Sequence, residues 1–348
     1  MPRKIILDCD PGHDDAIAMM LALASPELEV LGVTVVHGNV SLARTVRNAL
    51  VVRELLGAEV PIYAGADRPL VRERISAEAV HGVSGLDGPQ LSEPQGKPEQ
   101  QHAVSFIIET VLAHPGEVTM VPTGPLTNLA LALRLEPKIA GLIPQIVLMG
   151  GSLDTGNWTP AAEFNILCDP HAARIVFESG IPIVMMGLNL THQVIATPRR
   201  VERFRALGSR VGEVTAQLLE FFREHHVTRY GWEGAALHDP CTVAYLIRPE
   251  LFKTQAMYVA IETNEGLNFG RTVCDRWGVT QGVAAGHTGS HGQSPALVKS
   301  HSDPAMAGTQ AGLVLAGNLG QPANAQVGLA VDAEGLFDLL VERISKYR

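Results

Sequence analysis

Four aspartates stand close together near the start of the chain, in the stretch LDCDPGHDD. They are Asp8, Asp10, Asp14 and Asp15, and they follow a short apolar run. Carboxylates at this spacing repel one another, so folding them together is costly unless a cation or a hydrogen-bonding ligand offsets their charge. With no cysteine pair or histidine pair beside them, Ca²⁺ or Mg²⁺ is favoured over zinc. Helix capping by Asp14 and Asp15 is the alternative, but it leaves Asp8 and Asp10 unexplained.

Further polar motifs follow at separate places along the chain. They are Gly38-Asn39, VHGVSGLDG at residues 80–88, TGPLTN at 123–128, MGG at 149–151, NWTPAAEFN at 157–165 and LHDP at 237–240. Amides and carboxylates of this kind can form hydrogen bonds to a polar ligand. Histidine titrates near neutral pH, so His81 and His238 could transfer a proton or hydrogen-bond to a leaving group.

This succession of motifs resembles the nucleoside hydrolase family of the inosine-uridine-preferring type. The resemblance covers nearly the whole chain except residues 278–317. The sequences of residues 81–88 and 157–165 are most similar to those of the pyrimidine-preferring ribonucleoside hydrolases. The resemblance implies an enzyme that binds one Ca²⁺ and cleaves the N-glycosidic bond of ribonucleosides with water, giving ribose and a free base. It also implies a homodimer or a homotetramer.

The resemblance further implies a role for each motif. The metal ligands would be the carboxylates of Asp10, Asp15 and Asp239 and the backbone carbonyl of Thr123, with Asp8 orienting them. Asp10 would also be the general base for the attacking water, while His81 and His238 would serve the departing base. The substrate-binding residues would be Asp14, Asn39, Met149, Asn157, Glu163, Asn165, His226 and Tyr230. Of these, His226 and Tyr230 lie where the family contacts the base.

Other interpretations remain open at this point. Asn39 and Asn157 could be turn residues, Met149 could be core packing, and a lone histidine is often structural. For the whole protein, the alternatives are a purine-preferring or non-specific nucleoside hydrolase, a Mg²⁺-dependent phosphatase with an Asp-x-Asp nucleophile, and a Ca²⁺-dependent nucleoside-binding protein that does not turn over. Residues 157–165 disfavour the phosphatase, because their amides and carboxylate suit a ribose.

Alternating segments must position these motifs. Strand-like runs are expected at residues 4–8, 29–37, 61–64, 118–122, 145–149 and 183–187, and helices at 14–24, 41–56, 103–114, 125–134, 170–179, 211–225, 239–247 and 333–347. Strands that are apolar on both faces and alternate with helices predict an α/β fold, with a mostly parallel, Rossmann-like open sheet flanked by helices. No linker divides the series, so a single domain over residues 1–348 is expected. The acidic cluster then falls at the carboxyl end of the first strand, where such sheets bind ligands.

Composition excludes several classes of protein. The chain has 348 residues, of which 46% are apolar and 18% are charged, which is too apolar for a disordered protein. The net charge of −9 argues against a nucleic-acid partner. The longest apolar run, residues 16–24, is about half a membrane span. With no leader sequence and four scattered cysteines, we expect a cytoplasmic protein with reduced thiols and no membrane association.

Residues 278–317 differ from the rest of the chain. They are rich in glycine, contain His287, His291 and His301, and have no aromatic residue. Such a composition is typical of a long surface loop or a disordered insertion. The spacing of His287 and His291 could suit a metal only on a helix, which the surrounding glycines disfavour.

Overall fold

The computed structural model describes residues 1–280 and 321–347. The main sheet is built around β1, whose apolar run is buried on both faces. Eight strands lie in the order β3-β2-β1-β4-β5-β6-β12-β9. Their bounds are β1 Arg3–Cys9, β2 Leu28–Val35, β3 Ile62–Ala64, β4 Val118–Pro122, β5 Ile146–Met149, β6 Ile183–Met186, β9 Phe252–Met257 and β12 Ala325–Val331. All neighbours pair in parallel except β12 and β9, which are antiparallel.

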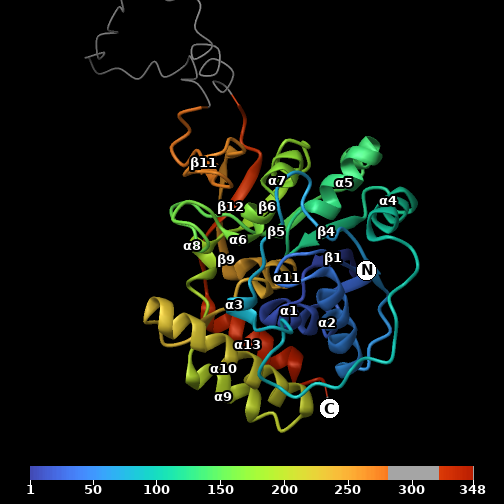
Figure 1. Cartoon of the computed structure of the whole chain (residues 1–348), viewed down its shortest axis with the longest axis vertical. Coiled ribbons are helices and arrows are strands. Elements are labelled where there is room, and N and C mark those ends of the chain that lie inside the picture. Colours follow the sequence, from blue (N-terminus) through green and yellow to red (C-terminus); the bar gives the residue numbers. More distant parts are fainter. Residues whose placement is uncertain (281–320, 348) are drawn as a thin grey trace, which may run out of the picture.

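Two apolar cores cover the two faces of this sheet. Along β1, Ile5 and Leu7 belong to one core and Ile6 belongs to the other, because successive side chains point to opposite faces. The first core is completed by α1 (His13–Leu23), α2 (Leu42–Leu55), α9 (Pro198–Arg205), α10 (Arg210–Tyr230), α11 (Pro240–Ile247) and α13 (Ala333–Ile344). The second is completed by α4 (Ala103–Ala113), α5 (Thr127–Leu135), α6 (Phe164–Cys168) and α7 (Pro170–Phe177). Figure 1 shows these two helical layers on either side of the strands.

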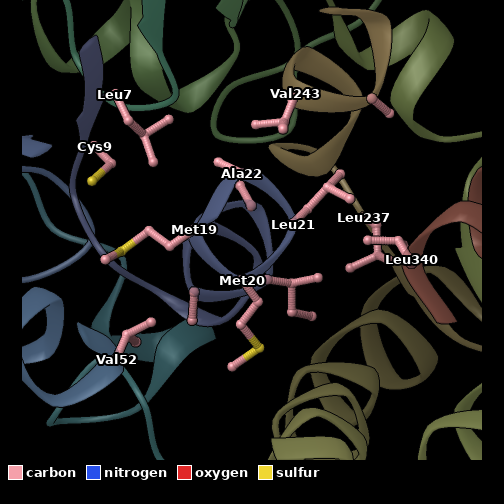
Figure 2. Packing of buried hydrophobic residues seen from close by; sticks show 14 of the residues in the cluster. Leu7, Cys9, Met19, Met20, Leu21, Ala22, Val52, Leu237, Val243 and Leu340 are labelled. Atoms are coloured by element: carbon pink, nitrogen blue, oxygen red, sulfur yellow. The ribbon is translucent and has the colours of Figure 1, made fainter. Parts of the chain in front are cut away.

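Helix α1 runs through the middle of the first core. Its residues from His13 to Ala22 are all buried, as expected of a helix that is apolar on every side. In Figure 2, Met19, Met20 and Leu21 point from α1 toward different neighbouring elements. The first turn of this enclosed helix therefore has a fixed place at the end of β1.

The remaining elements are short. They are α3 (Glu78–His81), η1 (Pro137–Gly141), α8 (Leu188–Thr191), η2 (Pro249–Leu251), β7 (Ile195–Ala196), β8 (Ala235–Ala236), β10 (Val259–Ile261) and β11 (Thr272–Cys274). The last four strands form two antiparallel pairs, β7 with β8 and β10 with β11. Among the helices that the structure describes, none has the length and apolar character that crossing a membrane requires.

The expected α/β fold and mostly parallel sheet are confirmed, with differences at particular elements. The sequence did not predict α9, β9 or β12. The helix expected at residues 211–225 continues to Tyr230, where Gly231 ends it in a left-handed conformation with φ of 68°. The insertion expected at residues 278–317 lies, from residue 281 onward, outside the described residues, as do His287, His291 and His301.

Candidate active site

The carboxyl ends of four parallel strands bring the predicted motifs together. Asp10 follows β1, Asn39 follows β2, Thr123 follows β4 and Met149 ends β5. Because these strands are parallel neighbours, their carboxyl ends share one edge of the sheet. Asp239 reaches the same place from the start of α11, which packs against α1.

A group of buried carboxylates forms the floor of this site. One oxygen from each of Asp14, Asp15 and Asp239 lies within 4.8 Å of the others. Asp10 is fully buried beside them, and the negative charge of Asp15 disfavours a negative charge on Asp10. Burial, followed by mutual repulsion, raises the pKa of Asp14 to about 7 and holds the pKa values of Asp10 and Asp239 well above the ordinary range. The cluster would therefore gain from a bound cation.

Hydrogen bonds orient the carboxylate of Asp15. Its Oδ2 accepts the backbone N–H of Gly12 at 3.0 Å, in a capping box, and the amide of Asn39 at 3.2 Å. Its Oδ1 accepts the hydroxyl of Thr123 at 2.8 Å. Helix capping by Asp15, the alternative to metal binding, is thus present, but it uses only Oδ2 of the carboxylate. Asp239 stands at the N-cap of α11 and makes no side-chain capping bond there.

Two glycines let the chain approach Asp10 closely. A Cβ at Gly38 or at Gly124 would overlap an oxygen of the Asp10 carboxylate. Oδ2 of Asp10 accepts the backbone N–H of Asn39 at 2.7 Å, whereas Oδ1 is buried and has no partner among the described residues. An unpartnered buried oxygen is costly unless a ligand uses it.

The donor set fits a hard divalent cation. It consists of the carboxylates of Asp14, Asp15 and Asp239, and within the described ranges no lysine or arginine makes an ion pair with them. Oxygen ligands of this kind suit Ca²⁺ or Mg²⁺. Oδ1 of Asp8 accepts the hydroxyl of Thr34 in β2 at 2.7 Å and the amide of Asn128 in α5 at 2.8 Å, whereas its Oδ2 is buried without a partner among the described residues. Its pKa is raised by burial to about 6.

A cavity with about 870 Å³ of empty space opens above the carboxylates. Every residue predicted to bind substrate lines it, together with the two predicted histidines and two of the predicted metal ligands. These residues are Asp14, Asn39, His81, Thr123, Met149, Asn157, Glu163, Asn165, His226, Tyr230, His238 and Asp239. Asp10 and Asp15 do not line the cavity and lie buried behind its wall.

One wall of the cavity is fixed by Glu163 and Asn165. The Glu163 carboxylate caps α6 and accepts three backbone N–H groups, those of Gly151, Asn165 and Ile166. The Asn165 amide donates to the Thr123 carbonyl at 2.7 Å, which joins this wall to the carboxylate floor. Asn157 accepts the N–H of Phe164 through Oδ1. These polar groups have fixed positions before any ligand arrives.

Five histidines line the cavity, and three of them are each held through Nδ1. His81 contacts Nδ1 of His13 at 3.0 Å, His238 contacts the Thr191 hydroxyl at 2.8 Å, and His226 bonds to the Phe222 carbonyl at 3.0 Å. Burial lowers the pKa of His226 to about 4 and those of His81 and His238 well below the ordinary value. Their resting form is therefore neutral.

Several residues of the site were not predicted from the sequence. His192 and Phe222 line the cavity, and Thr191 and His13 hold two of the imidazoles. The resemblance implies only a backbone role for Thr123, yet its hydroxyl donates to Oδ1 of Asp15. His13 stands inside the aspartate motif, and that position was the one available signal.

Fold and site together are those of an α/β glycosidase. The sequence model described as "Inosine-uridine preferring nucleoside hydrolase" matches residues 5–338, and the chain belongs to this family of ribonucleoside hydrolases. It is 43% identical over 345 residues to a pyrimidine-specific ribonucleoside hydrolase, RihB, of Escherichia coli strain SMS-3-5 / SECEC, covering 99% of this chain and 98% of the relative.

Solved structures agree with the fold. A purine-preferring ribonucleoside hydrolase from Gardnerella vaginalis superposes with a TM-score of 0.83 at 32% identity, and the match covers 99% of both chains. A plant nucleoside hydrolase, PpNRh1, gives a TM-score of 0.83 at 33% identity, again over 99% of both chains. The inosine-uridine preferring enzyme of Bacillus anthracis, at 21% identity with a TM-score of 0.71 over 99% of both chains, supports the fold alone.

Proposed function

We propose that this enzyme is a Ca²⁺-dependent ribonucleoside hydrolase that favours pyrimidine nucleosides, uridine and cytidine. One observation carries the proposal: a buried carboxylate cluster with an unpartnered Asp10 oxygen adjoins a cavity lined by amides and carboxylates. The base preference rests on 43% identity, over nearly the full chain, to relatives named as pyrimidine-specific.

The ion would be held by the carboxylates of Asp10, Asp15 and Asp239 and by the carbonyl oxygen of Thr123. Asp14 is close enough to contribute an oxygen as well. A bound Ca²⁺ would acidify a neighbouring water and attract the hydroxyl groups of a ribose. Ca²⁺ takes six to eight oxygens, so these protein ligands leave room for such groups.

Asp10 would act as the general base. Its Oδ1 has no partner within the described part of the chain and can accept a proton from water. The water oxygen then bonds to the anomeric carbon while the bond from that carbon to the base nitrogen breaks, through an oxocarbenium-like transition state. Direct attack by water inverts the configuration at this carbon.

The sugar and the base would occupy different parts of the cavity. Five polar residues suit the ribose hydroxyls: Asp14, Asn39, Asn157, Glu163 and Asn165. The amide of Asn39 already donates to the Asp10 carbonyl and to Asp15, so its remaining capacity is the acceptor Oδ1. The base would lie by the imidazoles, with His81 and His238 as its hydrogen-bond partners and His226 and Tyr230 beside it. Aromatic rings there would stack on a planar base.

Release of ribose from a panel of nucleosides tests the proposal. Uridine, cytidine, inosine and adenosine should be assayed with added Ca²⁺ and after removal of metal by a chelator. We expect the highest kcat/KM for uridine or cytidine and loss of activity in chelator that added Ca²⁺ restores. Faster cleavage of inosine or adenosine would overturn the base preference. Ribose from none of the four, despite calcium binding, would instead support the non-catalytic binding protein.

Subunit number is a separate part of the proposal. Homodimers or homotetramers are implied by the family resemblance, and sedimentation velocity measures the assembly directly. A monomer at assay concentration would contradict it.

A further inference from the structure

His13 has no role in the function proposed above, yet it is fully buried beside His81. It is the first residue of α1, and its ring makes two polar contacts in different directions. Nδ1 of His13 lies 3.0 Å from Nδ1 of His81, and Nε2 lies 2.8 Å from the backbone carbonyl oxygen of Asp87. His13 thus links two parts of the loop that contains VHGVSGLDG, namely the end of α3 and the residues after it.

Packing fixes the plane of the His13 ring. Phe221 and Phe222 of α10 stack against it with centroids 5.2 and 5.5 Å away. The His81 and His13 rings meet edge to edge, with centroids 5.2 Å apart and planes inclined by 25°, and the His81 ring lies 5.1 Å from that of Phe222. Gly12 makes this approach possible, because a Cβ there would come within 3.0 Å of Nδ1 and Cε1 of His81. The Nδ1 edge of His81 therefore faces α1, and Nε2 is the nitrogen left for the cavity that His81 lines.

The Asp87 carbonyl determines where the hydrogens lie. A carbonyl only accepts hydrogen bonds, so Nε2 of His13 must carry a hydrogen. An imidazole with one hydrogen then has a lone pair on Nδ1, and the short contact requires His81 to donate from its own Nδ1. The His81 ring is left with a lone pair on Nε2.

The backbone N–H of His13 makes a second contact with His81 that favours a different arrangement of hydrogens. The backbone N–H of His13 lies 3.3 Å from Nδ1 of His81 and would favour a lone pair there. That alternative needs hydrogens on both nitrogens of His13, hence a positive charge enclosed by Phe221, Phe222 and a second imidazole. Burial without an acidic hydrogen-bond partner disfavours such a charge. A neutral His13 therefore favours the hydrogen on Nδ1 of His81, and the backbone N–H of His13 then has no acceptor in that nitrogen.

We propose that His13 is a positioning residue that fixes the hydrogen of His81 on Nδ1, so that His81 offers Nε2 to the ligand as a hydrogen-bond acceptor. The proposal rests on the proposed function for its catalytic consequence. A hydroxyl or N–H of the nucleoside would meet His81, and His238 would be the imidazole that donates to the departing base. The Thr191 hydroxyl at His238 can donate or accept, so it permits a hydrogen on Nε2 of that ring.

Nitrogen NMR tests the hydrogen placement without any turnover. In protein labelled with ¹⁵N-histidine, a long-range proton–nitrogen spectrum separates protonated from unprotonated ring nitrogens, and His81→Ala identifies the His81 signals by their loss. We expect an unprotonated Nε2 on His81 in the wild type and a changed His81 pattern in His13→Phe. A hydrogen on Nε2 of wild-type His81, or an unchanged pattern in His13→Phe, would overturn the proposal. Neither result depends on whether the protein hydrolyses nucleosides.

Kinetics test the link between the two histidines. His13→Phe retains a flat ring in the stack but removes both polar contacts, so kcat for the preferred nucleoside should fall about tenfold or more. In a His81→Ala background the same change should add less than about twofold, because residues that act through one another are not additive. Additive losses in the double variant would contradict the proposed link.

Two further variants separate hydrogen bonding from packing. His13→Asn can place Oδ1 near the position of Nδ1 and still accept from His81, so it should retain more kcat than His13→Phe. Phe221→Leu removes one stacked ring but leaves Phe222 and both His13 hydrogen bonds, so its kcat should fall less than that of His13→Phe. Equal losses for His13→Asn and His13→Phe, or a larger loss for Phe221→Leu, would show that packing alone is at work.

Discussion

The backbone N–H of Asn39 donates to Oδ2 of Asp10 over 2.7 Å, and it holds the carboxylate so that Oδ1 is buried without a partner in the part of the chain that the structure describes. One oxygen is thus fixed by the protein and the other is left for a ligand. A substitution that keeps the shape of Asp10 and removes its charge should therefore separate chemistry from folding.

Asp10→Asn should lower kcat about a thousandfold, because an amide cannot take a proton from water. The fold should survive, since burial and the charge of Asp15 already oppose ionisation of Asp10 in the absence of metal. Ribose release measures the first effect, and Tm in metal-free buffer measures the second, which should be unchanged or higher. Near-normal turnover by this variant would refute the general-base assignment.

Gly38→Ala should damage the site more than the fold. The added Cβ would overlap Oδ2 of Asp10 and displace the carboxylate, so activity should fall about a hundredfold or more. Overpacking of this kind costs about 1–3 kcal/mol of stability. Gly141→Ala is the matched control, because a Cβ there meets no atom within 4 Å, and its activity and Tm should match those of wild type. If both variants are equally active, the close approach at Asp10 is unimportant.

Thr191→Val should weaken the enzyme through His238. Its Oγ1 contacts Nδ1 of His238 at 2.8 Å, and valine would leave that buried nitrogen unsatisfied at a cost of about 1–3 kcal/mol. Without this contact the His238 ring is no longer held in one orientation, so kcat should fall about tenfold, with a smaller effect on KM. Thr215→Val removes a buried threonine hydroxyl that bonds to the Val211 carbonyl in α10, away from the cavity, and its kcat should be unchanged. A parallel loss in both variants would indicate a general effect on stability.

Calcium should bind more tightly as pH rises from about 5 to about 8. Burial holds the pKa of Asp14 at about 7 and raises those of Asp10 and Asp239 further, so the ion must displace protons at lower pH. Isothermal titration calorimetry in buffers of different ionisation enthalpy measures both the affinity and the protons released. An affinity independent of pH would contradict this assignment of the ligands.

The same raised pKa values set the sign of the effect on stability without metal. A carboxyl with a raised pKa binds more protons when folded, so it makes the free energy of unfolding fall as pH rises from about 4 to its folded-state pKa. His226, whose pKa is lowered to about 4, acts in the opposite direction between about pH 4 and 6.5. The rise in Tm on adding calcium is therefore the informative quantity, and it should grow with pH.

A substrate that lacks one ribose hydroxyl should be rejected strongly. Backbone contacts hold Glu163 and Asn165 in fixed orientations, so these groups cannot shift to compensate for a hydroxyl that the deoxy sugar lacks. We expect kcat/KM for 2′-deoxyuridine to be about a thousandfold or more below that for uridine. Comparable rates for the two would show that the ribose does not bind as proposed.

The sequence predicted the strands that are buried on both faces, because such strands are continuous apolar runs. β9 was missed since four of its six residues are at least partly exposed and its sequence, FKTQAM, has no clear alternation. α9 was missed because PRRVERFR buries only Val201 and Phe204 among its charged residues. Elements at the edge of a fold take their structure from neighbours, and no local pattern records that.

The residues of the site also fall into those that a local sequence pattern predicts and those that it does not. Asp8 to Asp15 could be recognised together because they are adjacent in the chain. His13 and His81 are 68 residues apart, and Thr191 and His238 are 47 apart, so each pair exists only once the chain is folded. Roles that depend on a partner distant in sequence therefore need the structure.

β12 occupies an inner place in the sheet, between β6 and β9, although it is the last strand in the chain. The helix after it, α13, packs on α1, and Figure 2 shows Leu340 of α13 in the same cluster as Leu21. Consequently, the helix that carries the acidic cluster leaves the ribosome early but completes its packing only after residues 325–344 have followed. Long-range contacts of this kind slow folding, and until then the apolar flanks of α1 and β6 are open to chaperones or to aggregation.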